Sequence, residues 1–197
     1  MEKRDQILKA AAECFMNYGY SKTTMSDIGR MVGMNKASLY YHFKDKLELY
    51  SVMIRNLRTE HMAALKLRLK SIGKSQHIIE FLKSEIDFAK SISFNYLSGN
   101  GGTEHNKDET KEVFNDIVQQ DINIVRDLLS DELKAGNITE CNPQEMAIRI
   151  LMVSRGLLLA NCPLDMPMSK RESGYKAVKY EIGEVVGLML KGLASDK

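Results

Sequence analysis

The stretch TMSDIGRMVGMNKASLYYHFKDK, residues 24–46, decides the fold of this chain. It contains two short helical patterns separated by a glycine turn, and a third pattern begins at its end. Thr24 precedes the first pattern and Asp27 follows three residues later, which is the spacing of a capping box. We interpret the stretch as a helix-turn-helix, a unit that places its second helix in the major groove of DNA.

The turn of this motif depends on Gly33, where the first helix ends and where we expect a positive φ. Gly29 lies where a neighbouring helix can approach closely. Alanine would allow nearly the same approach and is the better helix former by about 1 kcal/mol. Asn35 is a good N-cap for the next helix, which we expect to span residues 36–42.

The helix expected at residues 36–42 has a core face and an outer face. At about 100° per residue, Leu39 and Phe43 share one side of it. A helix this short is not stable alone, so it must dock through Leu39. The opposite side combines small residues with hydroxyl groups, as a helix lying in the major groove requires. These outer residues are Ala37, Ser38, Tyr40 and Tyr41.

Asp45 and Glu48 form a second capping-box pattern, so a further helix begins at about Lys46. A lysine in the first turn of a helix opposes the helix dipole. The position is explained if Lys46 contacts a phosphate group. The alternative is an ordinary exposed lysine.

The rest of the chain predicts an all-α protein of about nine helices. It has three prolines, no tryptophan and no alternating strand pattern. We expect an N-terminal three-helix helix-turn-helix domain at residues 1–46, joined to a larger helical regulatory and dimerisation domain at residues 47–197. In the first domain Gly19 closes a helix at 4–18. In the second, Asn106 and Gly136 bound a helix at 107–135, Asn142 caps one at 143–161, and the last spans 170–193.

Composition excludes several classes of protein. The net charge is only +2, but residues 1–46 carry a balance of +3, a small basic excess at the motif. The odd number of cysteines, Cys14, Cys141 and Cys162, argues against a disulfide framework. No signal region and no apolar run of membrane-spanning length is present. We therefore expect a cytoplasmic protein with no membrane partner.

Residues 24–49 resemble the N-terminal domain of the TetR family of bacterial transcription regulators. The run Leu-Tyr-Tyr-His-Phe-Lys at 39–44, followed by Lys46, is the most specific part. Gly29 replaces a usual alanine and Asn35 a usual serine. The resemblance covers about the first quarter of the chain. The full pattern is Thr24, Ile28, Gly29, Gly33, Met34, Lys36, Ser38, Leu39, Tyr40, Tyr41, His42, Phe43, Lys44, Lys46 and Leu49.

The resemblance implies a set of DNA contacts. Phosphate contacts fix register and groove-facing side chains carry sequence information. Phosphate contacts are implied for Thr24, Tyr40, Tyr41, His42 and Lys46. Base-edge contacts are implied for Lys36, Ala37, Ser38 and Tyr41. For His42 the alternative is a packed ring with a satisfied nitrogen.

The resemblance also implies a homodimer through the helices at about 143–161 and 170–193. An apolar stripe in the last helix fits this expectation, as does a pair of glycines four residues apart at Gly183 and Gly187. Intrachain packing would use the same surfaces. The stripe comprises Val178, Ile182, Val185, Met189 and Leu193, and the facing set comprises Ile148, Leu151, Met152, Leu158 and Leu159.

The family usually encloses a pocket for a small molecule, and adaptable apolar side chains could line one here. These side chains serve equally well as core. Arg155 requires a charged partner, which is either a carboxylate of the protein or, as the second choice, an acidic ligand. The candidate lining residues are Met62, Phe81, Phe88, Phe94, Tyr96, Phe114, Met152, Arg155 and Cys162.

Two other classes of function are possible. An enzyme is disfavoured because His42, His61, His77 and His105 are scattered, no metal-ligand spacing occurs, and neither a phosphate-binding glycine motif nor any other cofactor motif is present. A helical adaptor that binds only proteins would lack salt-dependent affinity for duplex DNA. We expect a ligand-responsive repressor that binds a palindromic operator as a homodimer and is released by an unknown small molecule.

Overall fold

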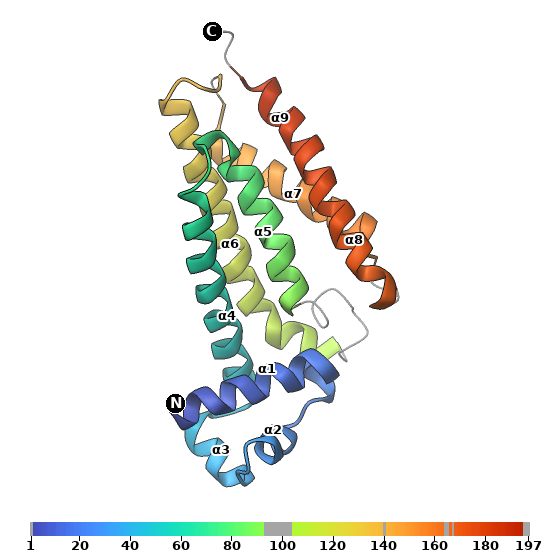
Figure 1. Ribbon diagram of the computed structural model, residues 1–197. Helices are drawn as coiled ribbons and strands as arrows, with labels where there is room; N and C mark the ends of the chain where they lie inside the picture. The colour runs from blue at the N-terminus through green and yellow to red at the C-terminus, as the bar shows by residue number, and fades with distance from the viewer. Residues whose placement is uncertain (1, 93–103, 140, 164–165, 167, 195–197) are drawn as a thin grey trace. The chain divides into compact units, whose positions relative to one another are not determined.

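The computed structural model describes residues 2–92, 104–139, 141–163, 166 and 168–194. Within these ranges the chain is helical, with a single isolated bridge between Ile138 and Ala194 and no β-strand (Figure 1). The all-α class predicted from the sequence is therefore confirmed.

The helices follow one another with short connections. The N-terminal part contains α1 (Lys3–Lys22), α2 (Met25–Met31), α3 (Lys36–His42) and α4 (Lys46–Leu69). A 3-10 turn, η1 (Lys74–Gln76), leads into α5 (His77–Ile92). Then come α6 (Glu104–Lys134), α7 (Pro143–Asn161), α8 (Met168–Glu181), the π-helical turn η2 (Ile182–Val186) and α9 (Gly187–Gly192).

The chain divides into two compact units. The first comprises the described residues of Met1–Met62 and Ser91–Asn115, and the second those of Ala63–Lys90 and Asp116–Lys197. The helices α4, α5 and α6 each contribute residues to both units. The domain boundary expected after residue 46 stays a prediction, since the first unit includes α4 as far as Met62.

The core of the first unit contains a cluster of aromatic rings from α1, α4 and α6. Tyr50 lies at its centre, with ring centroids 5.1 Å from Phe15, 4.9 Å from Tyr20 and 6.4 Å from Phe114. All four side chains are buried. Edge-on ring pairs of this kind stabilise a core beyond the burial of their area.

Gly19 has φ 88° and ψ 157°, a conformation that only glycine adopts readily. The helix expected to close at Gly19 is interrupted there, but the chain makes one more helical turn and α1 ends at Lys22. Gly136, with φ 68°, ends α6 as expected. The predicted start of α6 is wrong: the helix begins at Glu104, so Asn106 lies inside it and is not its cap.

The second unit contains α7 packed against α8 and η2. Two ion pairs connect α5 with α8, one between Asp87 and Lys179 and one between Lys90 and Glu172. A Cβ at Gly183 would lie 3.4 Å from Nζ of Lys83 on α5. The glycine face of the last helix therefore packs on α5 of the same chain, the intrachain alternative stated above.

The π-helical turn alters the predicted stripe in the last helix. Val178, Ile182 and Val186 are each 0% exposed, whereas Val185 and Met189 are only half-buried. A π turn holds one residue more than an α turn, so the buried position after Ile182 is Val186 and not the expected Val185. The expectation of a regular helix over 170–193 is wrong at this turn.

Candidate nucleic-acid interface

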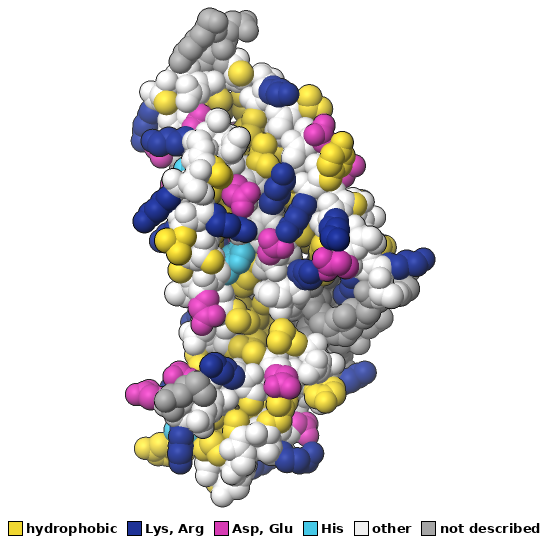
Figure 2. Space-filling view, in the orientation of Figure 1, with side chains coloured by type: hydrophobic (Ala, Val, Ile, Leu, Met, Phe, Trp, Pro, Cys, Tyr) yellow, Lys and Arg dark blue, Asp and Glu magenta, His cyan; other side chains and the backbone are white. Residues whose placement is uncertain are grey.

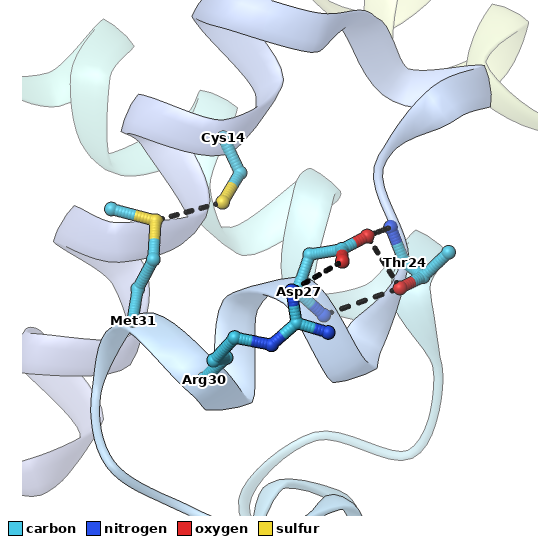
Figure 3. Close-up of polar contacts among 5 residues, drawn as sticks. All are labelled: Cys14, Thr24, Asp27, Arg30 and Met31. Carbon is cyan, nitrogen blue, oxygen red and sulfur yellow. Dashed lines mark hydrogen bonds and ion pairs between the residues drawn. The ribbon is translucent and has the colours of Figure 1, made fainter.

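Thr24 begins α2 with the predicted capping box (Figure 3). Its hydroxyl accepts a hydrogen bond from the Asp27 N–H at 3.2 Å, and the Asp27 carboxylate accepts from the Thr24 N–H at 3.0 Å. The Thr24 hydroxyl also donates to that carboxylate at 2.6 Å, and these hydrogen bonds hold the pKa of Asp27 below its ordinary value. Thr24 remains exposed at the start of the helix.

Gly29 and Gly33 shape the turn between α2 and α3. Gly33 has φ 65°, as predicted, and the Met34 N–H donates to the Gly29 carbonyl at 2.8 Å. A Cβ at Gly29 would lie 2.7 Å from the Met34 oxygen and 3.0 Å from Cδ1 of Leu39. The suggestion that alanine would fit equally well is therefore wrong, because a backbone oxygen occupies the space.

The helix α3 spans the predicted residues, and Asn35 caps it by accepting from the Ser38 N–H at 2.8 Å. Leu39 and Phe43 are 0% and 1% exposed, so they are the docking residues. Arg4 of α1 covers the outer side of Phe43, with its guanidinium carbon 4.5 Å from the ring centroid. The predicted division of α3 into two faces is thus present.

The outer side of α3 presents the residues predicted to meet DNA. Lys36, Ala37 and Tyr40 are exposed, and Tyr41 reaches 88% exposure. Figure 2 shows Lys and Arg side chains together with hydrophobic ones at the end formed by α2 and α3. This mixture of cations, rings and small residues suits a surface that contacts both phosphates and base edges.

Ser38 and His42 lie at the border of this surface and are half-buried. The His42 ring packs edge-on against Tyr41 with a centroid distance of 5.4 Å. Both readings of His42 are compatible with that position, since a half-buried ring can pack and still offer a nitrogen.

Lys46 begins α4 and is half-buried. Asp45 caps the helix by accepting from the Glu48 N–H at 2.7 Å, while the Glu48 carboxylate accepts from the Lys44 N–H. The Lys46 ammonium points to the end of α1, where it donates to the Tyr20 and Thr23 carbonyls. Tyr20 and Thr23 could not be predicted as partners of Lys46, because they lie 26 and 23 positions away and no local pattern links them to it.

A sulfur pair joins α1 to the end of α2. The Cys14 thiol donates to Sδ of Met31 across 3.0 Å (Figure 3). Burial raises the pKa of the Cys14 thiol, and the nearby Asp27 carboxylate adds to the effect. Cys14 is therefore a packing residue and not a reactive thiolate.

Residues 7–53 match the family described as Bacterial regulatory proteins, tetR family. This match covers the N-terminal quarter of the chain, including α2, α3 and the start of α4. The chain is similar to the HTH-type transcriptional repressor Rv1474c of Mycobacterium tuberculosis, with 31% identity over 96 residues that cover 46% of this chain and 51% of the repressor. The regulator YhgD of Bacillus subtilis is 23% identical over 80% of this chain and 83% of its own length.

Solved structures share the fold over nearly the whole chain. A transcriptional regulator from Cytophaga hutchinsonii superposes with a TM-score of 0.77 at 23% identity, covering 97% of this chain and 98% of that one. The alignment with the mycobacterial repressor spans only about half of that protein. The family match at residues 7–53 includes α2, α3 and the start of α4, which together with α1 form the reading head. The relatives named here are described as transcriptional regulators.

Arg155 has a carboxylate partner within the second unit. Its guanidinium lies 3.3 Å from the carboxylate of Asp121 on α6, a side chain that is only 6% exposed. The preferred reading of Arg155, an interhelical ion pair, is therefore present. A buried carboxylate requires such a partner, which gives Asp121 a structural role that the sequence analysis did not assign.

The predicted ligand-binding residues occupy different surroundings. Met62 and Phe114 belong to the first unit, while Phe81, Phe88 and Cys162 are buried in the second. Met152 is 68% exposed on α7. Phe94 and Tyr96 lie outside the described residues. The role of all these residues in ligand binding stays a prediction.

Cys162 is held by close packing at the end of α7. A Cβ at Gly174 of α8 would lie 2.6 Å from both the Cys162 Sγ and the Asn161 oxygen.

Among the side chains that the structure describes, no group of three or more His, Cys, Asp or Glu residues could hold a metal ion. No described helix is long and apolar enough to cross a membrane.

Proposed function

We propose that this protein is a ligand-responsive transcriptional repressor that binds a palindromic operator as a homodimer and is released by a small molecule. The observation that carries the proposal is the division of α3. Leu39 and Phe43 anchor the helix, while Lys36, Ala37, Tyr40 and Tyr41 are left exposed. An anchored helix with an outer face of this chemistry can lie in a major groove.

Individual roles follow from position on the reading head. Lys36 and Ala37 lie at the start of α3, the end of a recognition helix that usually meets base edges. Lysine can donate to guanine O6 or N7, and an alanine methyl can touch the thymine methyl. Ser38 and Tyr41 complete the base-reading set, and Thr24, Tyr40 and His42 supply phosphate contacts. The 1–46 domain would thus act as the reader and 47–197 as its regulator.

The homodimer would form through exposed apolar surfaces of the last helices. On α7, Ile148, Met152 and Leu159 are 38%, 68% and 49% exposed, and nothing lies within 4 Å of a Cβ built at Gly156. On the last helical stretch, Tyr180 and Leu188 are 66% and 67% exposed. Contiguous apolar side chains with a small residue between them suit close packing against a second copy.

Pairing is needed because a single short helix reads few bases. A two-fold dimer places two recognition helices on half-sites about 34–36 Å apart or a multiple of that distance. Repression is the simpler outcome, since a dimer seated on a promoter blocks it without further contacts. A small molecule bound in the regulatory part would favour a spacing of the two readers that no longer fits the operator.

Selection of bound duplexes from a random DNA pool tests the proposal. We expect a two-fold symmetric site whose affinity falls steeply with salt. Titration of the selected duplex in a chemically diverse ligand screen should then find compounds that release it. Failure to enrich any duplex, with affinity independent of salt, would instead favour an adaptor that binds only proteins.

A further inference from the structure

The ammonium group of Lys46 is engaged inside the reading head. Nζ donates to the backbone oxygens of Tyr20 at 2.9 Å and Thr23 at 3.3 Å, and it lies 4.2 Å from the centroid of the Tyr20 ring. A lysine ammonium has three N–H groups. At least two of them therefore point at the end of α1 and not away from the protein.

The end of α1 requires such a donor. After the break at Gly19 the chain makes one turn and becomes extended at Thr23, whose N–H donates to the Gly19 carbonyl at 3.1 Å. Carbonyls at the end of a helix need donors from outside the helix. The Thr23 hydroxyl lies 2.7 Å from the Gly19 carbonyl oxygen and 3.2 Å from that of Cys14, so its single O–H can donate to either or be shared. Lys46 supplies the next donors, for the Tyr20 and Thr23 carbonyls. A cation is favourable at this end of a helix, which offsets its unfavourable place at the start of α4.

The first turns of α4 hold the end of α1 at two points. Tyr50, four residues after Lys46 and hence on the same side of α4, packs edge-on against the Tyr20 ring at 4.9 Å. Thr23 is 1% exposed and immediately precedes Thr24, the N-cap of α2. The position of α2, and with it α3, is therefore connected to α4 through the contacts of Lys46.

We propose that Lys46 is a positioning residue for operator recognition: its ammonium fixes the junction of α1 and α2 against α4 and thereby orients α3. The inference rests on the proposed DNA-binding function. It replaces the phosphate contact suggested by the helix-dipole argument, because the carbonyls at the end of α1 already explain the position of this lysine. The effect on DNA is exerted through α2 and α3.

The test compares Lys46→Met with Lys44→Met, which removes the same charge from an exposed side chain two residues away. Affinity for the selected operator and for a random duplex is measured across a range of salt. For Lys46→Met we expect about tenfold weaker operator binding, while affinity for the random duplex stays within about twofold of wild type. The salt slope, which is the slope of log binding constant against log salt concentration, should be unchanged within about 0.3. Lys44→Met should preserve the ratio of operator to random-duplex affinity.

The ratio is the decisive readout, since partial unfolding would lower both affinities equally. A salt slope smaller by about 0.9 with an unchanged ratio would make Lys46 a phosphate contact and overturn the proposal. Unchanged operator affinity would also overturn it. If wild type itself lacks salt-dependent affinity, the DNA-binding function fails first.

Should circular dichroism show that Lys46→Met does not fold, Lys46→Arg provides the same test. Arginine keeps the charge and so keeps counterion release at a phosphate, but its planar group does not reproduce the ammonium geometry between the two carbonyls. We expect severalfold weaker operator binding. Affinity equal to wild type would contradict the positioning role.

Discussion

Gly29 in the reading head and Gly183 in the second unit differ in the kind of atom that an added Cβ would meet. At Gly29 a Cβ would meet the backbone oxygen of Met34 at 2.7 Å, whereas at Gly183 it would meet the end of the Lys83 side chain at 3.4 Å. A backbone oxygen inside a tight turn cannot move away, but the end of a lysine can. The turn of the reading head therefore tolerates one geometry, and the packing of η2 on α5 tolerates several.

The largest effect is expected from removing the anchor of the recognition helix. Leu39 is 0% exposed, so Leu39→Ala should lower the free energy of unfolding by about 2–5 kcal/mol, as measured by urea denaturation. The matched variant Tyr41→Ala, at an 88% exposed site on the same helix, should change stability by less than about 0.5 kcal/mol while weakening operator binding. Equal destabilisation by both would contradict the division of α3 into two faces.

The difference between Gly29 and Gly183 can be tested with an alanine variant at each position. Gly29→Ala should destabilise the protein by about 1–3 kcal/mol, because the added methyl overpacks the turn. Gly183→Ala should lie within about 0.5 kcal/mol of wild type, since the Lys83 side chain can shift. Thermal unfolding of both variants provides the measurement. A neutral Gly29→Ala would show that the turn adapts after all.

The exposed face of α7 distinguishes a surface left for a partner from ordinary solvent-facing residues. Met152→Glu should weaken the proposed homodimer about tenfold or more, because a buried unpaired carboxylate is costly at an interface. Leu67→Glu on α4 is the control, since both side chains are 68% exposed. Sedimentation equilibrium should show dissociation for Met152→Glu only. Equal masses at every concentration would remove α7 from the interface.

The smallest expected effect is on how the free energy of unfolding falls in acid, through the capping box of α2. Hydrogen bonds from Thr24 hold the folded-state pKa of Asp27 below its ordinary value of 3.8. The stabilisation is therefore present above the ordinary pKa and is lost as pH falls through the depressed one. Unfolding curves from pH 6 to pH 2 should show a slightly smaller acid loss for Asp27→Asn than for wild type. Parallel curves would exclude this contribution.

The sequence predicts structure correctly where the determining interactions join residues only a few positions apart. The caps at Thr24, Asn35 and Asn142 and the positive φ at Gly33 depend on neighbours no more than five positions away. The buried side of α3 follows from helical period alone. Such local features determine most of the structure of the reading head. The helices of this part, and the buried and exposed sides of α3, could therefore be predicted from the sequence.

Sequence reasoning failed where partners are distant along the chain. The carbonyls that hold Lys46 lie 23 and 26 positions away, and Lys179 pairs with Asp87 across 92 positions. Neither pairing leaves a periodic or spacing signal. The π turn was missed for a related reason, since its register is set by packing of the last helix on its neighbours and not by residue propensity.

The burial of two of the three cysteines has a practical consequence. Cys14 and Cys162 are buried with thiol pKa values raised by burial, whereas Cys141, just before α7, is partly accessible. A maleimide spin label applied to the folded protein should therefore attach at Cys141 in preference to the others. Two paired chains would then carry one probe each, and a single interprobe distance from electron paramagnetic resonance would follow pairing, and its response to added compounds, in the unmutated protein.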